Sequence, residues 1–160
     1  MSQETYDLAV RLGQALHAKG LLLATAESCT GGGVAVAVTD VAGSTSWFDC
    51  GFVCYSNAAK VHQLDVPDAL IAQFGSVSEE VAAAMASGAL ANSNAHLALA
   101  TTGIAGPTGA VPGKPVGTVC FAWARGDQVQ TERKVFSGDR AAVRQQSVMH
   151  AMQGLLRMIA

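Results

Sequence analysis

The sequence predicts an α/β fold, a single-domain three-layer α/β/α sandwich built on a mixed sheet of about five strands. The first observation is that helical and strand-like hydrophobic periodicities alternate along the whole chain, with no internal repeat or low-complexity linker. The second is the length of 160 residues, which corresponds to one domain because domains usually hold roughly 100–200 residues. Residues 1–160 are therefore expected to form one domain.

The N-terminal third is expected to run helix, strand, helix. Apolar side chains recur with helical spacing from Leu8 to Leu16, and Gly20 suits the residue that ends such a helix. Residues 21–26 form an apolar run of the length of a buried strand. The three glycines that follow Thr30 allow a sharp turn into a second helix, which ends near Asp40.

The rest of the chain continues this alternation. Pro67 is typical of a first helical turn, and Ser78 followed by two glutamates is typical of a helix start. The short turn at Gly126 and Asp127 predicts an antiparallel hairpin. The expected elements are a loop at 41–50, a strand at 51–56, helices at 57–63, 67–74 and 78–92, a strand at 96–102, a loop at 103–117, strands at 118–125 and 128–136, and a helix at 139–158.

Composition excludes several classes of function. Charged residues make up 14% of the chain against a typical value of about 25%, and the net charge is −2, which disfavours disorder and a nucleic-acid-binding surface. Residues 81–113 contain no Asp, Glu, Lys or Arg, but polar residues and two prolines interrupt the ~18 consecutive apolar residues that a membrane span needs. The N-terminus shows no secretory signal, so we expect a cytoplasmic protein.

The four cysteines are expected to be reduced thiols rather than a disulfide framework, because no secretory signal accompanies them. Cys50 and Cys54 have no second pair of ligands at the spacing of a zinc site. The sequence therefore predicts no metal site.

Three stretches carry residue types suited to chemistry. The first, TAESCTGGG at 25–33, places small hydroxyls and glycines at a strand-to-helix junction, where backbone N–H groups face an anion or a developing oxyanion. It is neither a Walker loop nor a Rossmann fingerprint. Ser28 and Cys29 are both candidate nucleophiles, and the alternative is a capped glycine-rich turn without chemistry, with Cys29 a small core residue.

The second stretch, YSNAAK at 55–60, leaves a strand and enters a helix with Lys60 near its start. A lysine is usually a solvated surface charge. It can serve as the base for a serine only if desolvation or a neighbouring cation lowers its pKa from about 10.4.

The third stretch is the glycine-rich segment GIAGPTG at 103–109. Glycines such as Gly103 and Gly106 let backbone amides approach a phosphate or a flat ring, and a tight structural loop is the alternative. Arg144 lies at the edge of the apolar stripe of the last helix. A half-buried guanidinium there would bind an anion or a carboxylate, the alternative being an internal salt bridge.

Taken together and in this order, these stretches resemble the CinA C-terminal domain family, specifically its stand-alone members, the nicotinamide-nucleotide amidohydrolases. The resemblance covers essentially the whole chain. Larger members carry a preceding molybdopterin-binding-like domain, which we expect to be absent here. The segments that carry the resemblance are TAESCTGG at 25–32, GSTSWFDCGFVCYSNAAK at 43–60, VSEEVAAAMA at 77–86, TTGIAGPTG at 101–109, KPVGTV at 114–119 and GDRAAVRQQ at 138–146.

The resemblance implies hydrolysis of the carboxamide of nicotinamide mononucleotide to nicotinate mononucleotide and ammonia, in pyridine nucleotide salvage. It also implies a cytoplasmic enzyme that forms a homodimer or higher homo-oligomer and uses no metal or cofactor. The family's serine falls on Ser28 and its lysine on Lys60, a pair suited to an acyl-enzyme mechanism. Tyr55 falls where the family has an aromatic residue beside the site, and Arg144 where it has an arginine.

On this hypothesis the backbone at Thr30, Gly31 and Gly32 stabilises the oxyanion, while Tyr55 stacks on the pyridinium ring. The glycine loop, through Gly103 and Gly106, and Arg144 would hold ribose and phosphate. Two other interpretations remain open at this stage. One is a nucleotide-binding or scaffold domain without turnover, and the other is an amidase that uses Cys29.

Overall fold

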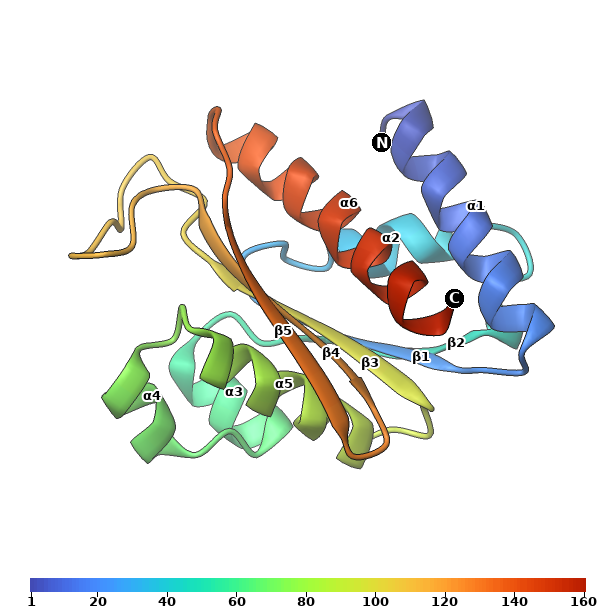
Figure 1. Ribbon diagram of the computed structural model, residues 1–160, viewed down its shortest axis with the longest axis horizontal. Helices are drawn as coiled ribbons and strands as arrows, with labels where there is room; N and C mark the ends of the chain where they lie inside the picture. Colours follow the sequence, from blue (N-terminus) through green and yellow to red (C-terminus); the bar gives the residue numbers. More distant parts are fainter.

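One mixed five-stranded sheet runs through the middle of the computed structural model, which describes residues 1–160 (Figure 1). The strand order is β2-β1-β3-β4-β5. Strand β1 pairs in parallel with both β2 and β3, whereas β4 is antiparallel to β3 and to β5. The strands are β1 Leu23–Glu27, β2 Phe48–Val53, β3 Leu97–Gly103, β4 Thr118–Arg125 and β5 Gln128–Val135. The predicted α/β class and the mixed sheet are confirmed.

Helices cover both faces of this sheet and complete the three layers (Figure 1). Helices α1, α2 and α6 lie on one face, and α3, α4 and α5 on the other. None of the helices has the length and apolar character needed to cross a membrane. Their bounds are α1 Gln3–Ala18, α2 Gly33–Thr39, α3 Asn57–Leu64, α4 Asp68–Phe74, α5 Glu79–Ala91 and α6 Arg140–Ile159, with a short 3-10 helix at Ser44–Ser46.

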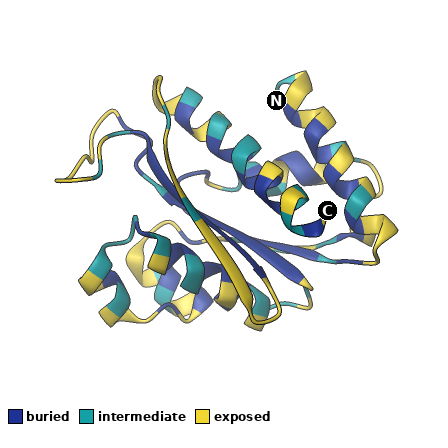
Figure 2. Ribbon diagram, viewed as in Figure 1, coloured by how far each residue is buried: buried dark blue, intermediate teal, exposed yellow.

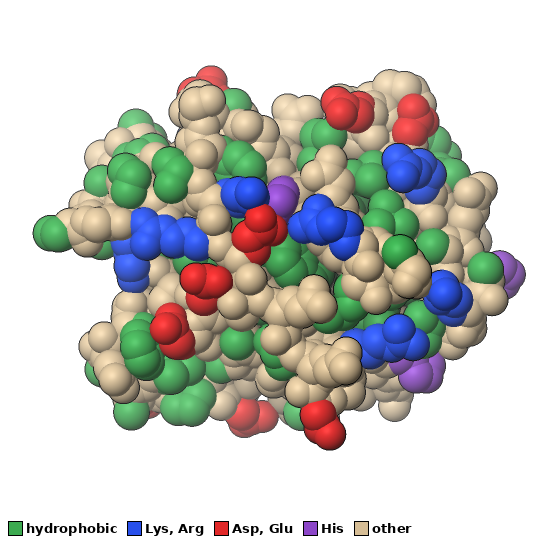
Figure 3. Space-filling view, in the orientation of Figure 1, with side chains coloured by type: hydrophobic (Ala, Val, Ile, Leu, Met, Phe, Trp, Pro, Cys, Tyr) green, Lys and Arg blue, Asp and Glu red, His purple; other side chains and the backbone are tan.

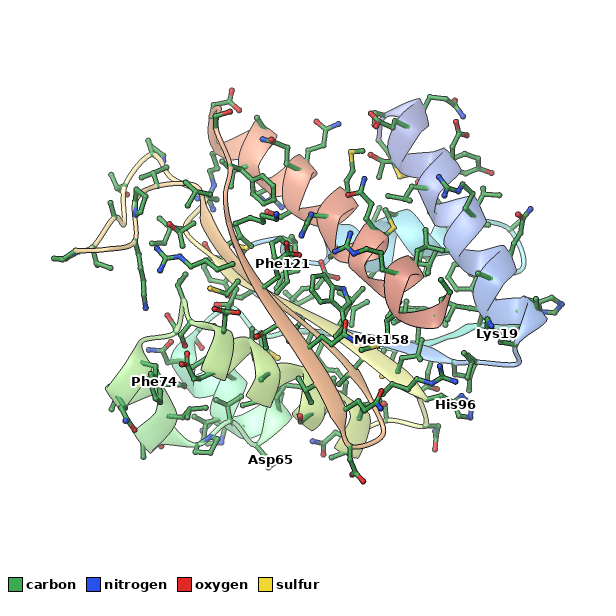
Figure 4. The ribbon with its side chains drawn as sticks, in the orientation of Figure 1. Lys19, Asp65, Phe74, His96, Phe121 and Met158 are labelled. Atoms are coloured by element: carbon green, nitrogen blue, oxygen red, sulfur yellow. The ribbon has the colours of Figure 1, made fainter.

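The two faces of the sheet are built from side chains of different size. Leu97, Leu99 and Phe121 pack towards α1, α2 and α6, and Figure 4 shows Phe121 between the sheet and α6, where its ring lies 4.7 Å from that of His150. The opposite face is lined mainly by alanines of β1, β3 and β4. Because these side chains are short, α5 packs close to the sheet.

Strand β5 forms one edge of the sheet, and none of its residues is buried (Figure 2). The carboxylate of Glu132 on this strand lies 2.9 Å from the amine of Lys134, 2.7 Å from the ring of His150 and 3.4 Å from the guanidinium of Arg157. Figure 3 shows that basic and acidic side chains alternate across the displayed face rather than forming a patch of one sign. Charged side chains on an edge strand oppose pairing with another chain.

One segment differs from the sequence prediction. Residues 41–50 are not all loop, because they include the 3-10 helix and the start of β2, so that strand lies three residues earlier than expected. Trp47 explains the early start, since it is buried against Gly13 of α1 and anchors the chain beside the sheet. Ser56 explains the early end, because its side chain caps α3 by accepting a hydrogen bond from the Ala59 N–H.

The carboxyl ends of the parallel strands β1, β2 and β3 meet at one edge of the sheet. The chain passes from β1 to a neighbour on one side and later to a neighbour on the other, so the strand order reverses at β1. Ligand sites in open α/β sheets lie outside the carboxyl ends of strands at such a reversal. Ser28 directly follows β1 at this edge.

Candidate active site

Ser28 is held at the end of β1 by the strands on both sides. Its backbone N–H donates to the carbonyl of Thr101 in β3 at 3.0 Å. The N–H of Cys54, which follows β2, donates to the carbonyl of Glu27 at 2.8 Å. These bonds bring the three strand ends together, so a side chain on the Ser28 turn can meet one that follows β2.

Lys60 lies on α3, which covers the face of the sheet opposite α2, and its side chain is only 1% exposed. Its Nζ atom lies 3.1 Å from the Oγ atom of Ser28. It also donates to the carbonyl oxygens of Cys54 at 3.1 Å and Tyr55 at 3.0 Å. The structure therefore brings together Ser28 and Lys60, the two residues that the sequence analysis selected for catalysis.

Burial lowers the pKa of the Lys60 amine, an effect that nearby Cys54 and Cys29 partly oppose. No carboxylate forms an ion pair with it, since the salt bridges of the chain all gather on Glu132. A neutral amine has two N–H bonds and one lone pair. In the structure Nζ donates to Oγ of Ser28, and the Ser28 hydroxyl donates to the carbonyl of Tyr55 at 3.5 Å. A neutral Lys60 would keep its two N–H bonds for the carbonyls of Cys54 and Tyr55 and leave its lone pair for the hydroxyl of Ser28.

The turn after Ser28 offers three free backbone donors, the N–H groups of Cys29, Thr30 and Gly32. Gly31 and Gly32 have φ angles of 59° and 91°, a region that favours glycine. The Gly31 N–H donates to the Ser28 carbonyl, so this donor is used within the turn. The N–H groups of Cys29, Thr30 and Gly32 have no acceptor within the protein.

Thr30 itself turns its side chain inward. It is 1% exposed, and its hydroxyl donates to the carboxylate of Glu27 at 2.6 Å. Sequence reasoning missed Glu27, because a glutamate at the end of a strand carries no signal of burial. The only sequence signal of this burial is that Glu27 lies among apolar and small residues shortly before the glycines.

Arg144 contacts the Ser28 turn, but not as expected. Its guanidinium donates to the carbonyls of Cys29 and Thr30, both at 3.2 Å. The expectation of a half-buried arginine is wrong, because Arg144 is exposed, and it forms no salt bridge. It reaches the turn because Gly31 has no side chain, since a Cβ atom there would lie 3.3 Å from its Nη2 atom.

A second arginine, Arg140, was missed by the sequence analysis. It donates to the carbonyl of Gly106 at 2.8 Å and to the hydroxyl of Tyr55 at 3.3 Å. Both Arg140 and Tyr55 are exposed, Tyr55 by 61%. The sequence signal for Arg140 is its position directly after Asp139, the residue that caps α6. Helical periodicity pointed to the apolar stripe of α6 instead.

The two glycines singled out at 103–109 differ in their surroundings. Gly103 is the last residue of β3, and a Cβ atom there would lie 2.7 Å from the side chain of Val119 in β4. Gly106 lies beyond the strand and has a φ of 82°. Gly106 is therefore the one that faces the arginine through its carbonyl, whereas Gly103 packs against the neighbouring strand.

Cys29 is poorly suited to act as a nucleophile. It is 5% exposed, and burial raises the pKa of its thiol to about 12. All four cysteines are free thiols. No group of three or more His, Cys, Asp or Glu side chains is arranged to hold a metal ion.

Comparison with known proteins places this arrangement in a family. The model of the CinA C-terminal domain matches residues 5–159. The chain belongs to the CinA C-terminal domain family. A relative from Pseudomonas putida named nicotinamide-nucleotide amidohydrolase PncC is 54% identical over 151 residues, covering 94% of each chain. The protein of the same name from Escherichia coli K12 is 51% identical over 154 residues, covering 95% of this chain and 93% of its own.

Solved structures of the CinA superfamily have the same fold. A CinA superfamily protein from Klebsiella pneumoniae superposes with a TM-score of 0.95 at 41% identity, over 98% of both chains. A competence/damage-inducible protein from Agrobacterium tumefaciens gives a TM-score of 0.97 at 38% identity, over 100% of this chain and 98% of its own. The resemblance seen in the sequence is thus confirmed at the level of family and fold.

Proposed function

We propose that this chain hydrolyses the carboxamide of nicotinamide mononucleotide to nicotinate mononucleotide and ammonia, in pyridine nucleotide salvage. The observation that carries the proposal is the 3.1 Å approach of the buried Lys60 amine to the Ser28 hydroxyl. The names of the relatives from P. putida and E. coli support the substrate.

In the proposed reaction the neutral amine of Lys60 takes the proton of Ser28 while Oγ attacks the carboxamide carbon. The carbon–nitrogen bond then breaks, and the Lys60 ammonium gives its proton to the departing nitrogen, which leaves as ammonia. An ester of Ser28 remains. Water attacks this ester while Lys60 takes one proton of the water and passes it to Oγ of Ser28. The product leaves as the acid and gives its carboxyl proton to solvent or to the released ammonia.

The free N–H groups of Thr30 and Gly32 are the oxyanion donors in this proposal. Backbone donors fixed before the reaction stabilise the charge that develops on the carbonyl oxygen, and one such donor is typically worth about 10²–10³ in rate. The N–H of Gly31, expected to share this role, is already bound to Ser28. Arg144 supports the turn by binding the carbonyls of Cys29 and Thr30.

Arg140, Tyr55 and the glycine loop would bind the rest of the mononucleotide. Tyr55 is exposed and its backbone carbonyl accepts from the Lys60 amine, so its ring is available to stack on the pyridinium ring. Arg140 keeps Tyr55 and Gly106 together and has no carboxylate partner, which leaves its charge for a phosphate. We therefore assign the phosphate to Arg140, in place of Arg144, with Gly103 supporting the loop.

Ammonia release from nicotinamide mononucleotide tests the proposal, with nicotinamide and nicotinamide riboside as comparison substrates. We expect turnover of the mononucleotide and its loss in Ser28→Ala and Lys60→Ala, while circular dichroism shows that both variants fold. Full activity of Ser28→Ala would overturn the dyad. Saturable binding without ammonia would instead support a binding or scaffold domain.

The cytoplasmic location and self-association remain predictions. Light scattering coupled to size-exclusion chromatography measures the mass of the particle in solution. A mass of one chain at micromolar concentration would contradict the expected homodimer or higher homo-oligomer.

A further inference from the structure

Glu27 is a fully buried carboxylate that no cation neutralises. It is the last residue of β1, one position before Ser28. Its oxygens accept four hydrogen bonds, from the hydroxyls of Thr30 at 2.6 Å and Thr25 at 3.3 Å and from the N–H groups of Val34 at 2.8 Å and Ala35 at 2.9 Å. A buried charge is tolerated only when such bonds replace its hydration.

Thr30 connects this carboxylate to the neighbouring strand. Its hydroxyl oxygen lies 2.8 Å from the hydroxyl of Thr101 in β3. Each hydroxyl has one proton, and Thr30 uses its own towards Glu27, so Thr101 donates to Thr30. The hydroxyls of Thr101 and Thr30 and the carboxylate of Glu27 thus form one directed chain, which we call the threonine relay.

The threonine relay spans the turn that carries Ser28. Glu27 lies directly before the serine and Thr30 two positions after it, so the Glu27–Thr30 bond closes the turn. Thr101 also accepts the Ser28 N–H through its carbonyl, which fixes the start of the turn on the same residue. Because the free N–H groups of Thr30 and Gly32 belong to this turn, the relay sets their position as well.

We propose that Glu27, acting through Thr30, is a positioning residue that holds the Ser28 hydroxyl and the oxyanion donors in place relative to the Lys60 amine. Glu27 touches no substrate. This inference rests on the proposed function, because this positioning matters only if Ser28 reacts. Displacement of a catalytic group by about 1 Å can reduce turnover roughly 100-fold.

The two acceptor oxygens of Glu27 are part of this role. All four neighbours donate hydrogen bonds, so both carboxylate oxygens must accept. In Glu27→Gln, an NH₂ group replaces one oxygen and opposes two of these donors, although the size is kept. We expect Glu27→Gln to lower both kcat and the unfolding temperature.

Thr30→Val gives a gentler test that keeps the shape of the side chain. We expect kcat for ammonia release to fall by about 10- to 100-fold with an unchanged KM, because the turn moves while the mononucleotide contacts stay. Thr30→Ser restores the hydroxyl and should restore kcat. The matched control is Thr102→Val, which removes a buried hydroxyl bond of 2.7 Å to Ser76 on the opposite face and should leave kcat unchanged.

Amide hydrogen exchange supplies a readout that does not need a substrate. We expect faster exchange at residues 28–33 in Thr30→Val but not in Thr102→Val. Unchanged kcat and unchanged exchange in Thr30→Val would overturn the inference, as would an equal loss of kcat in Thr102→Val. If the unaltered protein releases no ammonia from nicotinamide mononucleotide, the proposed function fails, while the exchange comparison still decides whether the relay holds the turn.

Discussion

The amine of Lys60 and the hydroxyl of Ser28 lie 3.1 Å apart, although the residues are 32 positions apart in the chain. Two parallel strands make this possible, because β1 and β2 both end at the same sheet edge. Ser28 follows the first strand directly, and the cap at Ser56 turns the chain after the second into α3. The amine is thereby buried on a rigid element rather than on a loop.

The pH dependence of turnover tests the role of Lys60. The base must be neutral, so kcat/KM should rise with pH and level off above the pKa of Lys60, which burial lowers from its usual value of about 10.4. The profile of ammonia release should therefore level off at a lower pH than an ordinary lysine would give. A profile whose midpoint lies at or above about 10.4 would show that the amine is not desolvated as the structure indicates.

The same burial predicts a pH-dependent stability. The folded state holds the Lys60 proton less tightly than the unfolded state, so the free energy of unfolding should increase with pH between the lowered pKa and about 10.4. In Lys60→Met this contribution is absent. The free energy of unfolding of the unaltered protein minus that of Lys60→Met, measured in urea, should therefore rise with pH by no more than about 1.4 kcal/mol per pH unit, the slope for one proton. A constant difference would contradict a lowered pKa.

The two arginines should give different kinetic signatures. Arg140→Ala removes the charge assigned to the phosphate, so KM for nicotinamide mononucleotide should rise about 10- to 100-fold, the equivalent of a charged hydrogen bond. Arg144→Ala loosens the turn and should lower kcat instead. Nicotinamide riboside, which has no phosphate, is the control for Arg140→Ala, and an equal loss of kcat/KM on it would exclude the phosphate assignment.

Cys29 should be dispensable for chemistry. Burial raises the pKa of its thiol to about 12, so little thiolate exists at neutral pH. Cys29→Ala should keep kcat near that of the unaltered protein, and iodoacetamide should not inactivate the native enzyme in step with modification of Cys29, as followed by mass spectrometry. Loss of ammonia release in Cys29→Ala with a normal fold would favour the cysteine-dependent amidase.

The sequence predicted the layers because apolar periodicity, a local pattern, identified the strands and helices. The residues alone left Ser28 and Cys29 both open as nucleophiles, and the pairing of Ser28 with Lys60 came from the resemblance of the TAESCTGG and YSNAAK segments to the family. The sequence did not predict the burial of Glu27, nor the choice between Arg140 and Arg144. Those depend on which side chains meet across the sheet edge, and contacts between α6 and the ends of β1 and β3 leave no periodic trace in the chain.

Gly88 of α5 provides a test of the close packing on the alanine-lined face. A Cβ atom at this position would lie 1.9 Å from the carbonyl oxygen of Leu64, the last residue of α3, so α5 and α3 would have to separate. Overpacking of this kind usually costs about 1–3 kcal/mol. In an unobstructed helix the same change stabilises by about 1 kcal/mol, so the sign of the effect is diagnostic.

We expect Gly88→Ala to lower the free energy of unfolding, whereas Ser87→Ala, at the exposed neighbouring position, should not. An unfolding midpoint in urea for Gly88→Ala at or above that of the unaltered protein would show that the two helices are not in backbone contact.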